Sequence, residues 1–455
     1  MLIPRRHLLQ LTAGVPLTRA AAQITPNTLR FASELEPLVA LLESTPREKC
    51  AAMAVAQLRK GTPYKQLLAA TFLAGIRNVN PCPPGFALHC VFVIHSAHRL
   101  SLEAPDDLRS LPLFYAIDNF KTAQDRDSKS NTGDYTMRAL DKLPASTPND
   151  FRDAMEQWNI ARAERAAASL ARHHRTEDAF SLLWEYGARD YRNIGHKAIF
   201  TANAHRTLHT IGLQHAEPVL RSIALGLLDF TPTQEMNGYT RDNQCYAANK
   251  AQLKSLLNAA PGTTAATPEI LTTLRQAPLA DATKDIAARI ARSTGSPQSI
   301  WDAIHLSAAE LAMRCHSANT IVGIHAVSAA NALRHAYQTT TSKETKLLLT
   351  LQAAGWMVQF RTFAESRPNA IRPLNILALE NLPNNRNTFL ATTMQHTFLK
   401  TDEVHYFKYL AALIEDSRLV SPQYQPALLA AIPYYAKGDA DPITPAMRLA
   451  QDALS

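Results

Sequence analysis

Apolar residues recur every three or four positions through most of the chain, which is the spacing of one face of an α-helix. This spacing predicts helices over residues 29–42, 49–58, 64–74, 150–172, 177–186, 197–210, 217–228, 286–293, 297–314, 321–337, 345–360, 387–399, 403–416 and 426–435. Residues 86–100 are strongly apolar, and a strand over 90–94 is conceivable there, but the flanking pattern favours a buried helix. The polar stretch 118–142 is expected to be a long loop.

These elements predict an all-α protein of roughly fifteen helices that pack as helical hairpins. Ser146 or Thr147 is expected to cap the helix that begins near residue 150. No strong linker divides residues 23–455, so we expect a single large multi-helix domain. Helical pairs recur without a fixed period, which makes a helical repeat protein the second choice.

Composition supports a folded, helical chain. Of the 455 residues, 46% are hydrophobic and 19% are charged, which excludes intrinsic disorder as the main state. No run reaches the roughly 18 consecutive apolar residues that a membrane-spanning helix needs, so we expect no membrane span. Part of the formal net charge of +8 comes from three arginines in residues 1–22, which contain no acid; 44 basic against 39 acidic residues remain, and this +5 is too mild and too evenly spread to indicate a nucleic-acid-binding protein.

Residues 1–22 have the pattern of a twin-arginine signal peptide. Arg5 and Arg6 precede a weakly apolar stretch over residues 8–17, and three alanines at 20–22 offer a small-residue cleavage site. The pattern predicts export to the periplasm or the extracellular space. A cytoplasmic location is expected if the segment is not a signal.

Several common catalytic motifs are missing from the sequence. The five cysteines are scattered and form no CxxC pair, so we expect neither a disulfide framework nor a zinc ribbon. The chain also has no GxSxG, no GxxxxGK[ST] and no GxGxxG motif. These absences argue against a serine hydrolase, a P-loop protein and a Rossmann-type dehydrogenase.

Histidine carries the candidate chemistry. The chain has 16 histidines, and imidazole is a common ligand of iron, zinc, copper and nickel. A single histidine on an apolar helix is usually a core residue, but several from distant segments can converge in a helical bundle. Those within the predicted helices and their flanks include His89, His95, His98, His196, His205, His209, His215, His305, His316, His325, His335, His396 and His405. His205 and His209 have the spacing of half a metal site, but no glutamate between them makes an HExxH motif.

His405 and Lys408 are three residues apart, so both project from one face of the helix predicted over 403–416. That helix is largely apolar, and a lysine on its buried side is costly as an ammonium ion. A neutral buried amine can add carbon dioxide and become an anionic carbamate, which binds a metal as a carboxylate does. The alternative is that the Lys408 side chain reaches the surface.

Three segments resemble the questin oxidase family of fungal and bacterial oxygenases. The first is DYRNIGHKAI at 190–199, where a histidine heads a helix, followed by the alanine- and leucine-rich residues 217–228. The second is IHAVSAANALR at 324–334, and the third is DEVHYFK at 402–408 with the residues that follow it. Members of this family are all-helical oxygenases that open or oxidise anthraquinone-type rings. One branch holds a mononuclear non-heme iron with four histidines and a carboxylated lysine.

The resemblance implies that His196, His325 and His405 are metal ligands and that Lys408 is the carbamate and catalytic residue. The fourth histidine should come from the N-terminal segment, where we expect His89. His95 and His98 are alternatives, because residues 90–92 replace the histidine-rich pattern of the family there. Neutral imidazoles with one anionic oxygen suit ferrous iron, with zinc as the alternative metal.

The expected function is therefore oxidation of an aromatic or quinone-like small molecule by dioxygen at a non-heme iron. Phe200, Trp356, Tyr406 and Phe407 are candidates for its aromatic lining, although a plain core position is favoured for each of them. Glu185 or Asp190 is a candidate hydrogen-bond acceptor for a ligand histidine, although a simple helix end at Gly187 is favoured.

Two other functions remain open at this point. One is an exported, non-catalytic helical repeat or scaffold protein whose histidines are core residues, and the other is a zinc hydrolase that uses the same histidines. Whether the histidines lie close together in the fold distinguishes a metal site from core histidines. If His196, His325 and His405 lie more than about 10 Å apart, they cannot share one metal at bond lengths near 2.1 Å.

Overall fold

The periodic apolar faces fold as α-helices throughout the part of the chain that the computed structural model describes. It describes residues 27–130, 134–141, 143–229, 239–373 and 385–455, so the predicted signal peptide lies outside the described residues. Within these ranges the regular structure is helical, with two isolated β-bridges and no strand, which confirms the all-α prediction.

The first ten α-helices are α1 (Glu36–Ser44), α2 (Cys50–Arg59), α3 (Tyr64–Asn78), α4 (His89–Glu103), α5 (Leu111–Ser128), α6 (Pro148–Glu156), α7 (Ile160–His173), α8 (Thr176–Gly187), α9 (His196–Ile211) and α10 (Ala216–Leu227). The others are α11 (Tyr239–Leu256), α12 (Thr267–Gln276), α13 (Leu279–Ala291), α14 (Pro297–Arg314), α15 (Thr320–Thr339), α16 (Lys343–Glu365), α17 (Arg386–Lys400), α18 (His405–Ser417), α19 (Gln425–Leu429) and α20 (Pro445–Leu454).

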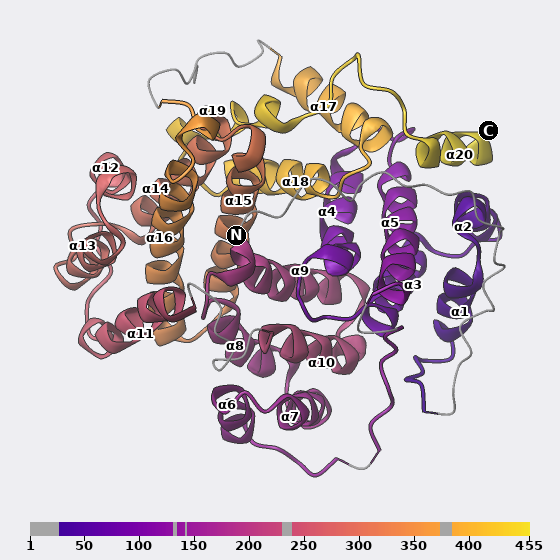
Figure 1. Cartoon of the computed structure of the whole chain (residues 1–455), viewed down its shortest axis with the longest axis horizontal. Coiled ribbons are helices and arrows are strands. Elements are labelled where there is room, and N and C mark those ends of the chain that lie inside the picture. Colours follow the sequence, from indigo (N-terminus) through magenta and orange to yellow (C-terminus); the bar gives the residue numbers. More distant parts are fainter. Residues whose placement is uncertain (1–26, 131–133, 142, 230–238, 374–384) are drawn as a thin grey trace.

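Four helices from distant parts of the chain form a closed ring at the centre of the fold. Helix α4 packs on α9, α9 packs on α15, α15 packs on α18, and α18 packs back on α4 (Figure 1). A second layer surrounds this ring: α3 and α5 cover α4, α8 and α10 cover α9, and α14 and α16 cover α15. The ring helices are therefore buried on most sides, and even polar residues of α9, such as Lys197, Asn203 and Arg206, lie in the interior.

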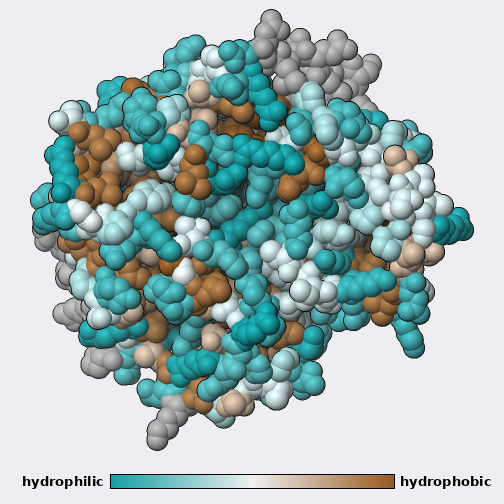
Figure 2. Space-filling view, turned by 180° about the vertical axis from the view of Figure 1, so that it is seen from behind, coloured by the Kyte–Doolittle hydropathy of each residue, from teal (hydrophilic) through white to brown (hydrophobic). Residues whose placement is uncertain are grey.

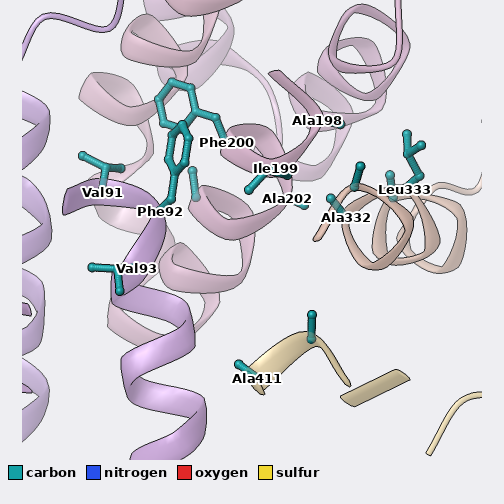
Figure 3. Close-up of a cluster of buried hydrophobic side chains, with 14 of the residues drawn as sticks. Val91, Phe92, Val93, Ala198, Ile199, Phe200, Ala202, Ala332, Leu333 and Ala411 are labelled. Carbon is teal, nitrogen blue, oxygen red and sulfur yellow. The ribbon is translucent and has the colours of Figure 1, made fainter. Parts of the chain in front are cut away.

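Apolar contacts hold the ring together on its inner side. Phe92 of α4 stacks on Phe200 of α9 with ring centroids 5.3 Å apart, and both side chains are fully buried. Figure 3 shows this pair beside Ile199 and Ala202 of α9, with Ala332 of α15 and Ala411 of α18 in the same cluster. One connected hydrophobic core runs from Leu35 to Ala450, as expected for a single domain.

The helix predicted over 150–172 is divided in two. Thr147 and Asp150 form the predicted cap as a reciprocal capping box at the start of α6. Trp158 then takes a left-handed conformation with φ of 53°, which ends α6 and lets α7 begin at Ile160. The predicted buried helix over 86–100 is confirmed as α4.

The expectation of a loop over residues 118–142 is wrong for its first part, because α5 continues to Ser128. Three of its polar side chains, those of Lys121, Gln124 and Asp127, are buried and partnered rather than solvated. Lys121 donates to the carbonyl of Glu43 at 2.8 Å and to the side chain of Gln124 at 2.7 Å. Asp127 accepts from two backbone amides of other segments. Tertiary contacts thus satisfy polar groups that the hydropathy pattern assigns to solvent.

On the surface, hydrophobic and hydrophilic side chains are interspersed across the face shown in Figure 2. None of the described helices is both long and apolar enough to cross a bilayer.

Candidate metal centre

Each helix of the central ring contributes one histidine to the same point. His89, His196 and His405 are the first residues of α4, α9 and α18, and His325 lies in the second turn of α15. One ligand nitrogen from each residue lies within 4.8 Å of the other three, and all four residues are buried. We call these residues the four-histidine cluster. The predicted ligands His196, His325 and His405 therefore do converge.

Strained turns aim two of these histidines. Gly85 and Phe86, with φ of +123° and +46°, precede His89, and Gly195, with φ of +84°, directly precedes His196. Asn193 and Ile194 are also left-handed. Such conformations cost about 1–3 kcal/mol each outside glycine and persist only where the surrounding structure enforces them. A Cβ atom on Gly85 would lie 3.0 Å from Nδ1 of His196, so the turn at Gly85 packs directly against the imidazole ring of His196.

The outer side of three of the rings is tied by a hydrogen bond to an oxygen atom. The partners are the carbonyl of Phe86 for Nδ1 of His89 (2.9 Å), the carbonyl of Ile321 for Nδ1 of His325 (2.7 Å) and the carboxylate of Glu403 for Nδ1 of His405. Carbonyl and carboxylate oxygens only accept, so these Nδ1 atoms carry the proton. The Nε2 atoms are then unprotonated and present their lone pairs to the centre.

The inner nitrogens lie unusually close for groups that cannot donate to one another. Nε2 of His196 is 3.0 Å from Nε2 of His89 and 2.9 Å from Nε2 of His325. Nε2 of His405 is buried without a hydrogen-bond partner. Converging lone pairs repel one another unless a cation lies between them, so this donor set fits a metal ion.

Burial also keeps the rings neutral. Desolvation is the largest cause that lowers the pKa of each ring in the cluster, and the nearby Lys408 lowers it further. The pKa of His405 falls to about 4. The four imidazoles are therefore in the form that binds metals near neutral pH.

Lys408 lies one turn after His405 on α18 and is 2% exposed, so the alternative in which it reaches the surface is wrong. Its Nζ atom has no hydrogen-bond partner and lies 5.7 Å from the ring centroid of Phe92. Burial lowers the pKa of Lys408 to about 7, so a large share of this amine is neutral near pH 7.

Glu403 was not expected as a site residue from the sequence pattern, although it belongs to the motif DEVHYFK at 402–408. Its carboxylate binds Nδ1 of His405 through one oxygen and accepts from the hydroxyl of Tyr435 at 2.6 Å through the other. The acceptors that were expected serve elsewhere: Asp190 pairs with Lys197 at 2.8 Å, and Glu185 accepts from Tyr246 at 2.9 Å. A carboxylate two residues before a helix-heading histidine is the signal that could have found it.

The structure also decides among the three histidines of α4. Only His89 joins the cluster. His98 lies beside Tyr64, and His95 is buried further along the helix with neither ring nitrogen hydrogen-bonded. His205 and His209 lie in a different group with Glu177.

A cavity of about 840 Å³ reaches the cluster, and its lining includes all four histidines. Apolar side chains stand at its mouth, where Phe86, Ile321 and Leu449 are 73%, 38% and 44% exposed. Its other lining residues are mixed, with Tyr115 and Val404 beside charged groups such as Arg126. The volume is that of a pocket for a small organic molecule.

The four aromatic candidates Phe200, Trp356, Tyr406 and Phe407 do not line this cavity, and the favoured core position is confirmed for Phe200, Trp356 and Phe407. They pack elsewhere: Phe200 on Phe92, Tyr406 on Tyr435, and Phe407 on Tyr115, while Trp356 lies near Tyr191 and Gly195. The aromatic walls of the cavity are Phe86 and Tyr115 instead.

No protein-family model matches the chain, and neither the curated proteins nor the solved structures compared with it gave a match. The case for a functional site therefore rests on the geometry described above.

Proposed function

We propose that the four-histidine cluster binds one iron ion and that the protein oxidises an aromatic or quinone-like small molecule with dioxygen. The observation that carries this proposal is the convergence of four buried histidine nitrogens at a cavity that all four residues line. A scaffold protein has no use for such an arrangement, because four facing lone pairs destabilise the fold unless a cation occupies the centre.

The separations of the nitrogens bear on the kind of metal. With bonds of about 2.1 Å, two ligand nitrogens lie about 3.0 Å apart at a right angle and about 3.4 Å apart at the tetrahedral angle. The observed 2.9 and 3.0 Å match the right angle. These separations suit a divalent ion with bonds of this length, iron and zinc included, and the choice of iron in this proposal rests on the resemblance of the three motifs. Iron supplies the activation of dioxygen, which amino-acid side chains cannot perform.

Lys408 supplies an oxygen ligand in this proposal. The lone pair of its neutral amine attacks the carbon of carbon dioxide, an N–C bond forms, and one N–H proton leaves to solvent. The product is a carbamate anion. It replaces a buried, unpartnered amine beside a cationic centre with a group of opposite charge, which removes both the desolvation cost and the repulsion.

The cavity supports a flat, partly apolar substrate. Tyr115 and the exposed ring of Phe86 offer surfaces on which an aromatic ring can stack, and Ile321 and Leu449 extend the apolar rim. Arg126 and Asn119 lie in the same lining and can bind ring hydroxyl or carbonyl oxygens. These features, with the resemblance of the three motifs, support an oxygenase of the questin oxidase type.

The deciding experiment is metal analysis of protein purified without added metal, together with oxygen consumption in the presence of a hydroxyanthraquinone. We expect tightly bound iron at about one ion per chain and oxygen uptake that depends on it. Zinc in the cluster, with ester or amide hydrolysis and no oxygen uptake, would favour the zinc hydrolase. A chain that binds neither iron nor zinc at the cluster would contradict the metal centre itself.

A further inference from the structure

A second group of ligand-type side chains lies on helices α8 and α9. Glu177, in the first turn of α8, faces His205 and His209, which are one turn apart on α9. One carboxylate oxygen is 3.1 Å from Nε2 of His205, and the other is 2.9 Å from Nε2 of His209. The two Nε2 atoms are 3.2 Å apart. Three ligand-type side chains from two helices therefore meet at one place.

His205 is held firmly in this orientation. Its Nδ1 atom is 3.0 Å from Nε2 of His335 on α15, so the opposite edge of the ring is directed to Glu177 and His209. Phe180 and Trp184 of α8 pack against its ring at centroid distances of 4.6 and 5.1 Å. A hydrogen bond on the outer nitrogen and packing on the ring face are how proteins orient metal-binding histidines.

The three residues differ in exposure in a way that suits an exchangeable ion. The side chain of His205 is 2% exposed, whereas those of Glu177 and His209 are 37% and 49% exposed. The lining of the 840 Å³ cavity contains none of the three. An ion at this point is thus open to solvent on one side, and water can complete its coordination.

We propose that Glu177, His205 and His209 form a second site, for a divalent transition-metal ion such as Zn²⁺ or Co²⁺. Two imidazoles and one carboxylate are ligands that these ions take together, and bonds near 2.1 Å fit donor atoms about 3 Å apart. The carboxylate comes from α8 and the imidazoles from α9, so the ion ties these helices together. Through His335, the same site is also connected to α15.

The two sites share helices but not an ion. His196 and His205 are nine residues apart on α9, which is about 14 Å along a helix at 1.5 Å per residue. His325 and His335 are ten residues apart on α15, which is about 15 Å. An ion in the second site therefore supports the two ring helices at their far ends from the four-histidine cluster. Binding there is expected to stabilise the fold rather than to take part in oxidation.

The test uses the full chain with its tightly bound metal in place, after brief dialysis against a chelator to empty exposed sites. Co²⁺ is then titrated while tryptophan fluorescence is followed, because Trp184 lies beside His205 and Co²⁺ quenches nearby indoles. We expect one additional Co²⁺ per chain with saturable quenching. Glu177→Gln and His209→Gln should each weaken this binding by at least about tenfold.

Controls separate this site from other sources of binding. His173→Gln removes an exposed histidine at the end of α7 and should leave the titration unchanged. Trp184→Phe should remove most of the quenching but not the bound Co²⁺, which is counted by metal analysis. His325→Ala should lose metal at the four-histidine cluster and keep the added Co²⁺. Retention of the tightly bound metal and of the helical circular dichroism shows that the His209→Gln chain is folded.

The proposal fails if the wild-type chain takes up no additional Co²⁺ in this titration. It also fails if Glu177→Gln and His209→Gln bind Co²⁺ as tightly as the wild type. Neither result bears on the four-histidine cluster, whose metal is measured separately in the same samples.

Discussion

The carboxylate of Glu403 accepts a hydrogen bond from Nδ1 of His405, which follows it by two residues in the chain. Tyr435 donates to the other carboxylate oxygen and fixes its direction. The contact places the imidazole proton on the outer nitrogen of His405 and leaves Nε2 to face His89 and His325. Such a contact orients a metal ligand and raises its basicity.

Removing this carboxylate should weaken metal binding without removing a ligand. We expect Glu403→Ala to lower the affinity of the cluster about 10- to 100-fold, and Glu403→Gln, which keeps an acceptor oxygen, to lower it less. The measurement is the rate and extent of iron loss to a chelator. Asp402→Ala is the matched control, because this neighbouring acid also lines the cavity but is exposed. Equal metal loss in the Asp402 and Glu403 variants would contradict the orienting role.

The ligand assignment predicts that His325→Ala and His405→Ala each abolish stoichiometric metal binding while the chain stays folded. Each substitution removes one of four nitrogens that meet at one point. Metal content and circular dichroism are measured on the same samples. His95→Ala is the control, since it removes a histidine of α4 whose ring nitrogens are also buried but lie outside the cluster. Near-native metal content in both ligand variants would show that the cluster is not the metal site.

Lys408 provides a test of the carbamate. Lys408→Met keeps the bulk but supplies no oxygen, so metal binding should fall, whereas Lys408→Glu supplies a carboxylate on a shorter stem and should bind more metal than the Met variant. In the native protein, stripping carbon dioxide at low pH should weaken metal binding, and returning bicarbonate at neutral pH should restore it. Carbon-13 NMR after exposure to labelled bicarbonate should show one carbamate carbon per chain. Full metal content in Lys408→Met would leave the histidines as ligands and exclude the carbamate.

Gly85 offers a test of the strained turn. A Cβ atom at this position would lie 3.0 Å from Nδ1 and 3.1 Å from Cε1 of His196, and its φ is +123°. Gly61 also has a positive φ, +89°, but has no atom within 4 Å of the added Cβ. Both alanine variants should lose about 1–3 kcal/mol of unfolding free energy, because a residue with a Cβ atom is strained at a positive φ. Only Gly85→Ala should also lose metal, because only it displaces His196. Metal loss in both variants, or in neither, would contradict the conclusion that the turn at Gly85 positions His196.

The lowered pKa of His95 makes the stability of the fold depend on pH. Burial lowers its pKa from about 6.5 to about 3, so between these values the unfolded chain binds a proton that the folded chain does not. Stability therefore falls as pH falls through this range, and from pH 7 to pH 5 this one residue contributes a loss of about 2 kcal/mol. Urea unfolding measures the free energy of unfolding at pH 7 and at pH 5. The decrease between the two pH values should be smaller in His95→Gln than in the wild type, by about 2 kcal/mol. His173→Gln, at an exposed position, should keep the wild-type difference.

The sequence by itself determined the class of the fold. Apolar residues at three- and four-residue spacing predict α14, α15 and α16 close to their observed bounds, because this spacing makes a continuous apolar face only on a helix. The same periodicity places His405 and Lys408 on one face of α18. The local pattern does not predict a helix where polar side chains have partners in other segments, because hydropathy does not include tertiary hydrogen bonds. Lys121 of α5, which donates to the carbonyls of Leu42 and Glu43, is an example.

The assembly of the metal centre was decided by the tertiary structure. Periodicity tells which face of a helix is buried but not which helix covers it, so nothing in the spacing brings α4, α9, α15 and α18 into one ring. Three of the four histidines are first residues of helices, where the preceding turn, and not the helical repeat, sets the direction of the side chain. This is why His89 could not be separated from His95 and His98 by sequence. Glu177 likewise meets His205 and His209 only because α8 packs on α9, a contact between residues 28 and 32 positions apart.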